Sequence, residues 1–212
     1  MPARIPPGQV LTKGWPTLHA GSIPAALTRE SWTLEVHGAV GAPFSIDFAA
    51  LLAMPQRTRR NDIHCVTSWS KVDMTWSGVP FSAIADRARP DPGVRFVVME
   101  CEQGFTTSLP LAALLDDDVL LAHSVDGQPL PAEHGGPARM LVPKRYFYKS
   151  AKWVRGLKFV VDDEPGYWEV RGYSNLADPW SETRYDVDDV RLIHRMRKAN
   201  LFRPLPPATE GP

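Results

Sequence analysis

Alternating apolar and polar residues recur along the chain and predict a protein built largely from short β-strands. Trp32, Leu34 and Val36 alternate with polar neighbours, which is typical of a strand with one buried face. Asp126 and Gly127 mark a tight turn after one of the later strands. The predicted strands cover residues 31–40, 57–66, 94–101, 118–125, 138–143 and 156–162.

Short helices are predicted between these strands. Residues 45–54 offer Ser45 or Asp47 as a helix N-cap, and Pro55 ends the segment. A proline near the first turn favours a helix at 79–88. The remaining predicted helices cover residues 110–117 and 186–200.

The order of these elements predicts a single α+β domain with mixed β-sheets and short helices. Long strands do not alternate regularly with long helices, which argues against a doubly wound parallel sheet. Residues 1–30 are rich in proline and glycine and are expected to form an extended segment. The domain then covers residues 31–185, and residues 186–212 are expected to form a C-terminal helix and a proline-rich tail.

Charge and hydropathy narrow the class of partner. The 212 residues include 24 basic and 24 acidic side chains, and this neutral balance argues against nucleic acid or an anionic membrane as the main partner. Residues 1–16 contain no signal-peptide core, and the apolar run at 48–54 is too short to span a membrane. We therefore expect a cytoplasmic protein without a membrane span, in which the two cysteines do not form a structural disulfide.

Cys65 lies in the stretch DIHCVTSWS and has several possible roles. A single cysteine is most often a buried apolar side chain. His64 is not expected to form a catalytic pair with it, because adjacent side chains on a strand point to opposite faces. A zinc site is not predicted, because Cys65 and Cys101 lack CxxC or HxxxH partners at the usual spacing. Spacing alone leaves the role of Cys65 open.

Cationic and hydroxyl side chains gather in the segment 128–159. His134 and Arg139 precede Ser150 and Lys152, and the last two share a side if the chain is extended there. Such residues can bind a phosphate-bearing ligand, Arg through a forked contact and Lys as a point charge. A solvated basic face is the alternative reading. The chain has no GxGxxG or Walker motif, so a dinucleotide or nucleoside triphosphate site is not predicted.

Four ordered motifs carry a family resemblance that runs from about residue 17 to residue 185. They are HCVTSWSKVDMTWSGVPFSAI (64–84), GQPLPAEHGGPARMLVP (127–143), KSAKWVRGLKFV (149–160) and GYWEVRGYSNLADPW (166–180). The chain resembles the sulfite-oxidase-fold molybdopterin oxidoreductases. More narrowly, it is similar to the compact bacterial sulfite oxidase-like proteins, which are related to the catalytic subunit of periplasmic methionine sulfoxide reductase.

The resemblance implies a mononuclear molybdenum–molybdopterin cofactor. It makes Cys65 the catalytic residue and the protein's sulfur ligand to molybdenum, and a soft thiolate suits such a metal. It implies cofactor contacts from residues of the second and third motifs, His134, Arg139, Lys149, Ser150 and Lys152, and from Cys101 at the end of the strand predicted at 94–101. Cys101 stands where relatives place a threonine near the pterin, and the alternative is a small residue that closes a strand. Thr17 and His19 are the N-terminal candidates for a pterin contact.

The resemblance further implies two-electron oxygen-atom transfer on a small sulfur- or nitrogen-oxide substrate. Thr67 stands where the methionine sulfoxide reductase branch has an acidic residue, and Lys71 is the only basic residue where sulfite oxidases have an arginine-rich segment. Two cysteines cannot hold an iron–sulfur cluster and no CxxCH motif is present, so we expect an external redox partner protein. The alternatives are sulfite oxidation proper and a molybdopterin-binding carrier without turnover.

Two groups of residues stay open at this point. The basic segment 191–198 is either a docking surface for the redox partner or a solvated helix face. The aromatic residues near the motifs either wall a pocket or belong to the core. These are Trp69, Trp76, Trp153, Trp168 and Trp180, together with Tyr146 and Tyr148, each of which is a candidate to place a hydroxyl near the metal.

Overall fold

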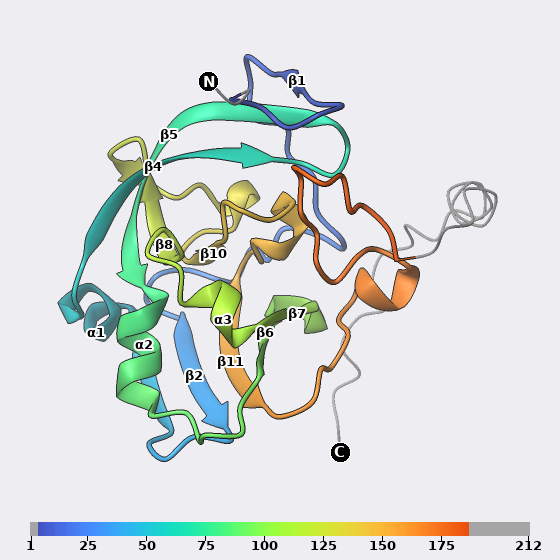
Figure 1. Cartoon of the computed structure of the whole chain (residues 1–212). Coiled ribbons are helices and arrows are strands. Elements are labelled where there is room, and N and C mark those ends of the chain that lie inside the picture. The colour runs from blue at the N-terminus through green and yellow to red at the C-terminus, as the bar shows by residue number, and fades with distance from the viewer. Residues whose placement is uncertain (1–3, 187–212) are drawn as a thin grey trace.

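The computed structural model describes residues 4–186, which form two β-sheets joined by short helices (Figure 1). The six-stranded sheet contains β1 (Val10–Leu11), β4 (Arg57–His64), β5 (Trp69–Pro80), β8 (Leu120–Val125), β9 (Gln128–Pro129) and β10 (Arg139–Leu141). Its strands β1, β5, β8 and β10 lie in a row, while β4 pairs with β5 and β9 pairs with β8. The five-stranded sheet contains β2 (Thr33–Gly38), β3 (Phe44–Asp47), β6 (Phe96–Cys101), β7 (Thr106–Pro110) and β11 (Val154–Val160).

Both sheets are mixed. The strand order of the second sheet is β3-β2-β11-β6-β7, and β2 runs parallel to β11 while the other pairs are antiparallel. In the first sheet, β1 is parallel to β5 and the remaining pairs are antiparallel. The expected single α+β domain with mixed sheets and short helices is therefore confirmed.

The helices are all short. They are α1 (Phe48–Ala53), α2 (Phe81–Ala88) and α3 (Leu111–Leu114), with the 3₁₀ turns η1 (Glu102–Gly104), η2 (Ala132–His134), η3 (Phe147–Lys149) and η4 (Glu169–Arg171). The longest within residues 4–186, α2, has eight residues, whereas a helix needs about 20 to cross a bilayer. No helix within residues 4–186 is long and apolar enough to cross a membrane.

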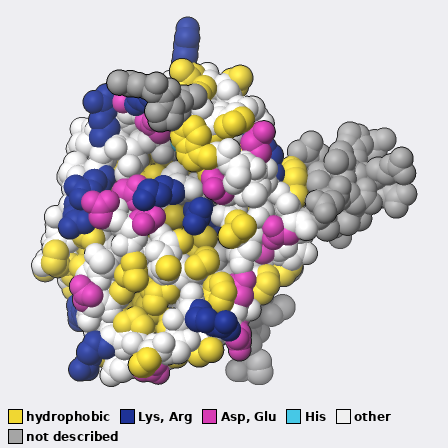
Figure 2. Space-filling model, viewed as in Figure 1, with side chains coloured by type: hydrophobic (Ala, Val, Ile, Leu, Met, Phe, Trp, Pro, Cys, Tyr) yellow, Lys and Arg dark blue, Asp and Glu magenta, His cyan; other side chains and the backbone are white. Residues whose placement is uncertain are grey.

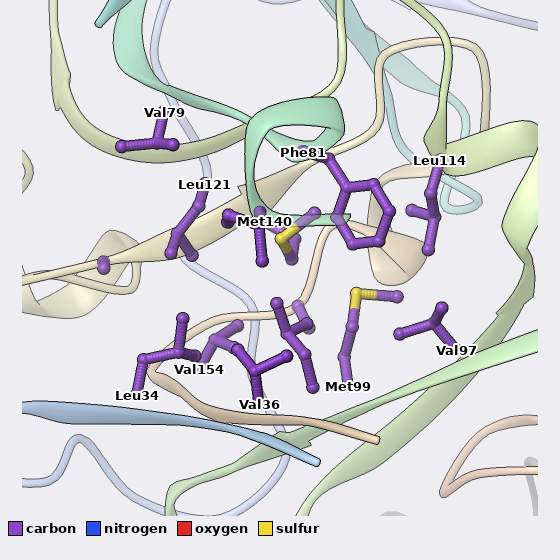
Figure 3. Packing of buried hydrophobic residues seen from close by; sticks show 14 of the residues in the cluster. Leu34, Val36, Val79, Phe81, Val97, Met99, Leu114, Leu121, Met140 and Val154 are labelled. Atoms are coloured by element: carbon purple, nitrogen blue, oxygen red, sulfur yellow. The ribbon is translucent and has the colours of Figure 1, made fainter. Parts of the chain in front are cut away.

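The main core lies between the five-stranded sheet, α2 and the adjoining strands of the other sheet. Figure 3 shows Phe81 of α2, Met99 of β6 and Met140 of β10 gathered in one space. All three are buried, and each buried side chain of this size contributes about 1.5–3 kcal/mol to folding. The core therefore fixes the two sheets against each other, and the loops at their ends are held in place.

The start of the first predicted helix was wrong. Residues 44–47 form β3, because Phe44 and Ile46 alternate with polar residues and the segment pairs with β2. The helix begins only at Phe48, and of the two candidate caps Asp47 is the one used: its carboxylate accepts the Ala50 amide at 2.8 Å. The pairing partner therefore decides the conformation of these residues.

Two boundaries matter for the site. The strand predicted at 57–66 ends at His64, so Cys65 lies in the turn between β4 and β5. The predicted helix at 79–88 begins at Phe81, because Val79 and Pro80 still belong to β5. The predicted C-terminal helix at 186–200 and the proline-rich tail lie outside the described residues, apart from Asp186.

The N-terminal segment has little regular structure but is tied to the domain. Of residues 4–30, only β1 is a strand, and it extends the sheet beside β5. Gln9 is buried, and the rings of Trp15 and Trp76 pack edge to face with centroids 5.5 Å apart.

On the face in Figure 2, basic and acidic side chains are intermixed, with hydrophobic side chains between them.

Candidate functional site

A cavity of about 250 Å³ lies where loops from several parts of the chain meet. Four of the sequence motifs contribute to its walls, and so does the N-terminal segment. Its lining residues are Trp15, Pro16, Leu18, His19, Ala20, Cys65, Val66, Thr67, Trp69, Glu102, Phe105, His134, Arg139, Phe147, Tyr148, Ser150, Ala151, Lys152, Trp153, Tyr167, Trp168 and Tyr173. Segments far apart in sequence therefore enclose one space.

Cys65 stands on the wall of this cavity in a tight turn. Its amide donates to the Trp69 carbonyl at 2.8 Å, and its carbonyl accepts the Ser68 amide at 3.0 Å. Ser68 has a φ of 72°, so the turn uses a left-handed residue that is uncommon outside glycine. The turn aims the thiol inward and leaves only 8% of Cys65 exposed.

The thiol of Cys65 has one side-chain hydrogen-bond partner, the Thr67 hydroxyl, with Sγ and Oγ1 3.1 Å apart. Burial raises the pKa of Cys65 above its ordinary value, although the contact with Thr67 acts in the opposite direction. A buried thiol of this kind is a poor nucleophile at neutral pH but becomes a thiolate when a metal binds it.

His64 turns away from the cavity. Its Nδ1 lies 2.8 Å from the Ser70 hydroxyl, and burial lowers its pKa. Within residues 4–186, no hydrogen bond joins its imidazole to the Cys65 thiol. His64 and Cys65 therefore do not form a catalytic pair. This agrees with the prediction from the sequence.

Two cations without acidic partners face the same cavity. Arg139 at the start of β10 is 1% exposed, and its guanidinium donates to the His134 carbonyl at 2.7 Å and the Ser150 carbonyl at 2.5 Å. Lys152 is half-buried and donates to the Glu133 carbonyl at 2.6 Å. Among residues 4–186, neither forms an ion pair.

Because these two cations are buried without a counter-charge among residues 4–186, their pKa values are lowered. Burial lowers the pKa of Arg139 to about 9. Burial, together with the charge of Arg139, lowers the pKa of Lys152 to about 7. An anion between them would offset both effects, because an opposite charge favours the protonated forms. The cavity is therefore electrostatically suited to an anionic ligand.

His134 completes this side of the cavity. Its ring stacks on Trp15 with centroids 3.6 Å apart and an interplanar angle of 2°. Burial, with the charges of Lys152 and Arg139, lowers the pKa of His134 to about 4, so the imidazole is neutral. Its Nδ1 is buried and has no hydrogen-bond partner in the described part of the chain, and the same holds for Trp69 Nε1. Both atoms belong to residues that line the cavity.

Ser150 also lines the cavity, but its hydroxyl serves the backbone. It accepts the Val142 amide at 2.9 Å, while its carbonyl holds Arg139. The structure therefore brings together five of the predicted site residues: Cys65, His134, Arg139, Ser150 and Lys152.

Two predicted site residues do not line the cavity. Lys149 is fully buried and donates to the Ser108 carbonyl at 2.8 Å and to Asn175 Oδ1 at 2.7 Å, and it forms an ion pair with Glu169. Cys101 ends β6 and is buried, and burial raises its pKa. A cofactor contact from either residue stays a prediction.

The aromatic residues divide between wall and core. Trp69, Trp153 and Trp168 line the cavity, whereas Trp76 is fully buried in the core and Trp180 is 47% exposed. Of the two tyrosine candidates, Tyr148 lines the cavity and donates its hydroxyl to the Ser174 carbonyl, while Tyr146 is not among the lining residues. His19 lines the cavity, and the other N-terminal candidate, Thr17, is absent from its walls.

Several lining residues were not among those predicted from the sequence. Trp15 belongs to the N-terminal segment that was expected only to be extended, and nothing in the local pattern links it to His134. Tyr167 and Tyr173 flank Trp168 in the motif GYWEVRGY, and this cluster of aromatic residues could have marked a pocket wall.

Comparisons with known proteins identify relatives of the chain. The family described as "Oxidoreductase molybdopterin binding domain" matches residues 20–168. The "Uncharacterized oxidoreductase YuiH" of Bacillus subtilis is 42% identical over 185 residues, which is 87% of this chain and 93% of that protein. The "Protein-methionine-sulfoxide reductase catalytic subunit MsrP" of Ralstonia nicotianae is 30% identical over 205 residues, which is 85% of this chain and 60% of that protein.

A solved structure is also similar. The crystal structure of the sulfane dehydrogenase SoxCD from Paracoccus pantotrophus matches with a TM-score of 0.59 and 26% identity, covering 64% of this chain and 40% of that chain. The chain thus spans nearly all of YuiH but less than two thirds of MsrP and of the SoxCD chain.

The cavity residues fit a molybdopterin. Its phosphate would meet Arg139 and Lys152, whose charges have no acidic partner among residues 4–186. His134 and Trp69 line the cavity, and each carries a ring nitrogen without a hydrogen-bond partner among residues 4–186, while aromatic side chains form much of the remaining wall. Cys65 supplies the soft sulfur donor that a metal in this space would take.

Proposed function

We propose, since this chain belongs to the family of oxidoreductases with a molybdopterin-binding domain, that it catalyses two-electron oxygen-atom transfer on a small sulfur- or nitrogen-oxide substrate. An external protein would exchange electrons with it. The observation that carries the proposal is the placement around one cavity of the Cys65 thiol and of Arg139 and Lys152, two cations that form no ion pair within residues 4–186.

The roles follow from the side chains. Cys65 would bind the molybdenum, while Arg139 and Lys152 would bind the phosphate of the pterin and His134 would bond its polar edge. When bound, the cofactor supplies a two-electron redox couple at which an oxygen atom is exchanged. The Ser150 carbonyl accepts a hydrogen bond from the Arg139 guanidinium. Ser150 would therefore orient Arg139 toward the ligand.

The substrate would enter beside the aromatic wall. Trp168, Tyr148 and Tyr173 line the cavity and form this wall. With Arg139 and Lys152 engaged by the cofactor, the remaining lining is largely apolar, which favours a neutral sulfoxide or amine oxide over the sulfite dianion. The relative named as a methionine-sulfoxide reductase supports the same substrate class.

Metal and pterin analysis of the purified full chain is the first test. We expect about one molybdenum and one pterin per chain, and the absence of both would contradict the proposal. Cys65→Ser should abolish turnover and change the absorption and paramagnetic signals of the molybdenum, because the sulfur ligand is lost. Unchanged signals would exclude a ligand role for Cys65.

Two dye-linked assays then decide the direction of turnover. The chain is expected to oxidise a reduced dye with a sulfoxide or N-oxide as acceptor. Faster dye reduction by sulfite would instead favour sulfite oxidation. If metal-replete protein performs neither reaction, a carrier role without turnover replaces the proposal.

A further inference from the structure

Two segments from opposite ends of the described chain enclose the turn that carries Cys65. One is the N-terminal segment around Gln9, and the other is the segment around Arg184. Both bond backbone carbonyls of the turn itself. Neither residue lines the cavity.

The N-terminal segment holds one side of the turn. Gln9 is buried and donates its amide to the Cys65 carbonyl at 3.1 Å, while its Oε1 accepts the Ser70 hydroxyl at 3.3 Å. The Val10 amide donates to the Ser68 carbonyl at 3.0 Å. Residues on both flanks of the turn are therefore tied to this segment.

The later segment holds the other side. Arg184 donates from Nη1 to the Val66 carbonyl, and its guanidinium lies over the Tyr146 ring at 4.8 Å. Its backbone carbonyl accepts the Ser174 amide at 3.0 Å, which anchors the segment to the aromatic wall. An arginine fixed at both ends of its side chain is a rigid donor.

The two segments also meet each other. Gly8 has a φ of 64°, and a Cβ at this position would come within 2.7 Å of Glu182 Oε1 and 3.4 Å of Arg184 Nη2. The positive φ favours glycine at this position, and the side-chain ends of Glu182 and Arg184 lie directly beside it. Both segments therefore bond the Cys65 turn close to where they approach each other.

We propose that Gln9 and Arg184 are positioning residues that hold the Cys65 turn in its metal-binding shape before the cofactor enters. The inference rests on the proposed function only in that Cys65 is taken as the metal ligand. A turn with a left-handed residue at Ser68 has a conformational cost, and contacts from outside the turn are needed to keep one shape. Holding a ligand in place in advance lowers the cost of binding.

A purely electrostatic role for Arg184 makes the opposite prediction. The charge of Arg184 acts to lower the pKa of the Cys65 thiol, so its loss would reduce the thiolate fraction and slow alkylation. Loss of the positioning contact would instead let the turn open and speed alkylation. The sign of the change separates the two roles.

The test is thiol labelling of the cofactor-free full chain with a maleimide at one fixed pH, with each cysteine followed by peptide mapping. Gln9→Leu keeps the bulk of the side chain and changes no charge, and Arg184→Leu removes both contact and charge. We expect the maleimide to label Cys65 about tenfold faster in each variant. The loss of one hydrogen bond shifts a local opening equilibrium by about that factor.

Two controls make the result specific. Cys101 is buried in β6 and reports general loosening, so its labelling rate should stay unchanged in both variants. Gln103→Leu cuts a different tie to the N-terminal segment, at Ser22, and should leave Cys65 labelling as it is.

Labelling of Cys65 at or below the original rate in Gln9→Leu and Arg184→Leu would overturn the inference. Equal acceleration at Cys101 would also overturn it, since the effect would then be a loss of overall stability. If Arg184→Leu does not fold, Gln9→Leu decides alone. None of these readings requires molybdenum or turnover, so failure of the proposed function would be seen separately.

Discussion

Lys149 and Lys152 are close neighbours in the sequence, yet the structure gives them opposite surroundings. The ammonium of Lys149 is fully buried and fully engaged, with Glu169, Asn175 and the Ser108 carbonyl around it. It joins η3 to η4 and to the edge of the five-stranded sheet. This lysine therefore has a structural role, because it links separate segments of the fold.

Lys152 faces the cavity with Arg139 beside it, and among residues 4–186 no carboxylate pairs with either. Both cations donate to carbonyl oxygens alone, and burial lowers the pKa of both. A buried charge is normally paired, so a pair of cations without a counter-charge indicates a ligand that brings one. Burial alone does not distinguish a structural cation from a binding cation; the partner does.

The largest effect is expected for Lys149→Met. Removing one partner of a buried ion pair leaves the Glu169 carboxylate uncompensated, which costs about 3–5 kcal/mol in the free energy of unfolding. Chemical denaturation measures this change. Lys149→Met combined with Glu169→Gln should recover most of the loss, because no isolated buried charge remains.

Lys144→Met is the matched control for this prediction. Lys144 pairs with Asp116 at 3.1 Å on the surface, where both side chains are largely solvated, and such pairs contribute about 0–1 kcal/mol. If Lys149→Met is no more costly than Lys144→Met, the ion pair with Glu169 is not the structural tie described above.

A smaller effect on a different property is expected for Lys152→Met. Inorganic phosphate, as a probe of the cavity, should bind the cofactor-free chain about 10- to 100-fold more weakly, because a charge-assisted hydrogen bond contributes about 1.5–3 kcal/mol. Calorimetric titration gives the dissociation constants. The free energy of unfolding should not fall, because no paired carboxylate is left behind and a charge that burial and Arg139 disfavour is removed.

Lys158→Met provides the comparison for phosphate binding. Lys158 pairs with Glu164 at 2.8 Å away from the cavity, so its removal should leave the dissociation constant unchanged. Equal weakening by both substitutions would mean that phosphate binds through the general charge of the protein rather than in the cavity.

The sequence predicted those strands in which buried apolar side chains alternate with exposed polar ones. In β2, Leu34 and Val36 are buried and their neighbours are not, so alternation was sufficient. The longest strand, β5, was missed because Lys71 and Asp73 interrupt its apolar positions and Asp73 has a φ of 64°. Its pairing with β4 and β8 decides its conformation, and pairing is invisible in a local pattern.

The polar strand β7 was missed for a related reason. Thr107 and Ser108 are fully buried in it, where they bond Glu169 and Asp163. A buried polar strand depends on partners far away in sequence, and hydropathy does not reveal them. The same limit applies to Glu169, whose pairing with Lys149 could not be foreseen from the motif.

The site was predicted from motifs rather than from spacing. Strand geometry correctly separated His64 from Cys65, although the structure places Cys65 in a turn after the strand. The motif order pointed to His134, Arg139, Ser150 and Lys152, and the fold brings them to one cavity with Cys65. Lys149 and Lys152 belong to the same KSAK segment, and only the three-dimensional partners of each distinguish them.

The smallest expected effect is the pH dependence of anion binding at Lys152. Its pKa in the folded chain is about 7, below the ordinary value for lysine of 10.5, because burial and Arg139 oppose its charge. Between these two values the unfolded chain binds a proton that the folded chain lacks. The cofactor-free protein should therefore gain stability as pH rises through this window.

Anion binding has the opposite dependence, because a phosphate favours the protonated lysine and a proton is taken up on binding. From pH 7.5 to 8.5 the dissociation constant for phosphate should rise by up to about tenfold. Burial lowers the pKa of His19 and lowers that of His134 to about 4, so neither imidazole gains a proton in this range, and Arg139, with a pKa of about 9, loses its proton mainly above it. Burial raises the pKa of Cys65, so its thiol stays protonated.

Lys152→Met should remove this slope and leave the weaker affinity nearly constant over the same range. Titration of both proteins at matched ionic strength separates the lysine from the general effect of screening. A slope that persists in Lys152→Met would assign the proton to another group. Lys152 would then act as a fixed charge in the cavity, as Lys149 does in its ion pair. The two lysines would then differ only in their partners.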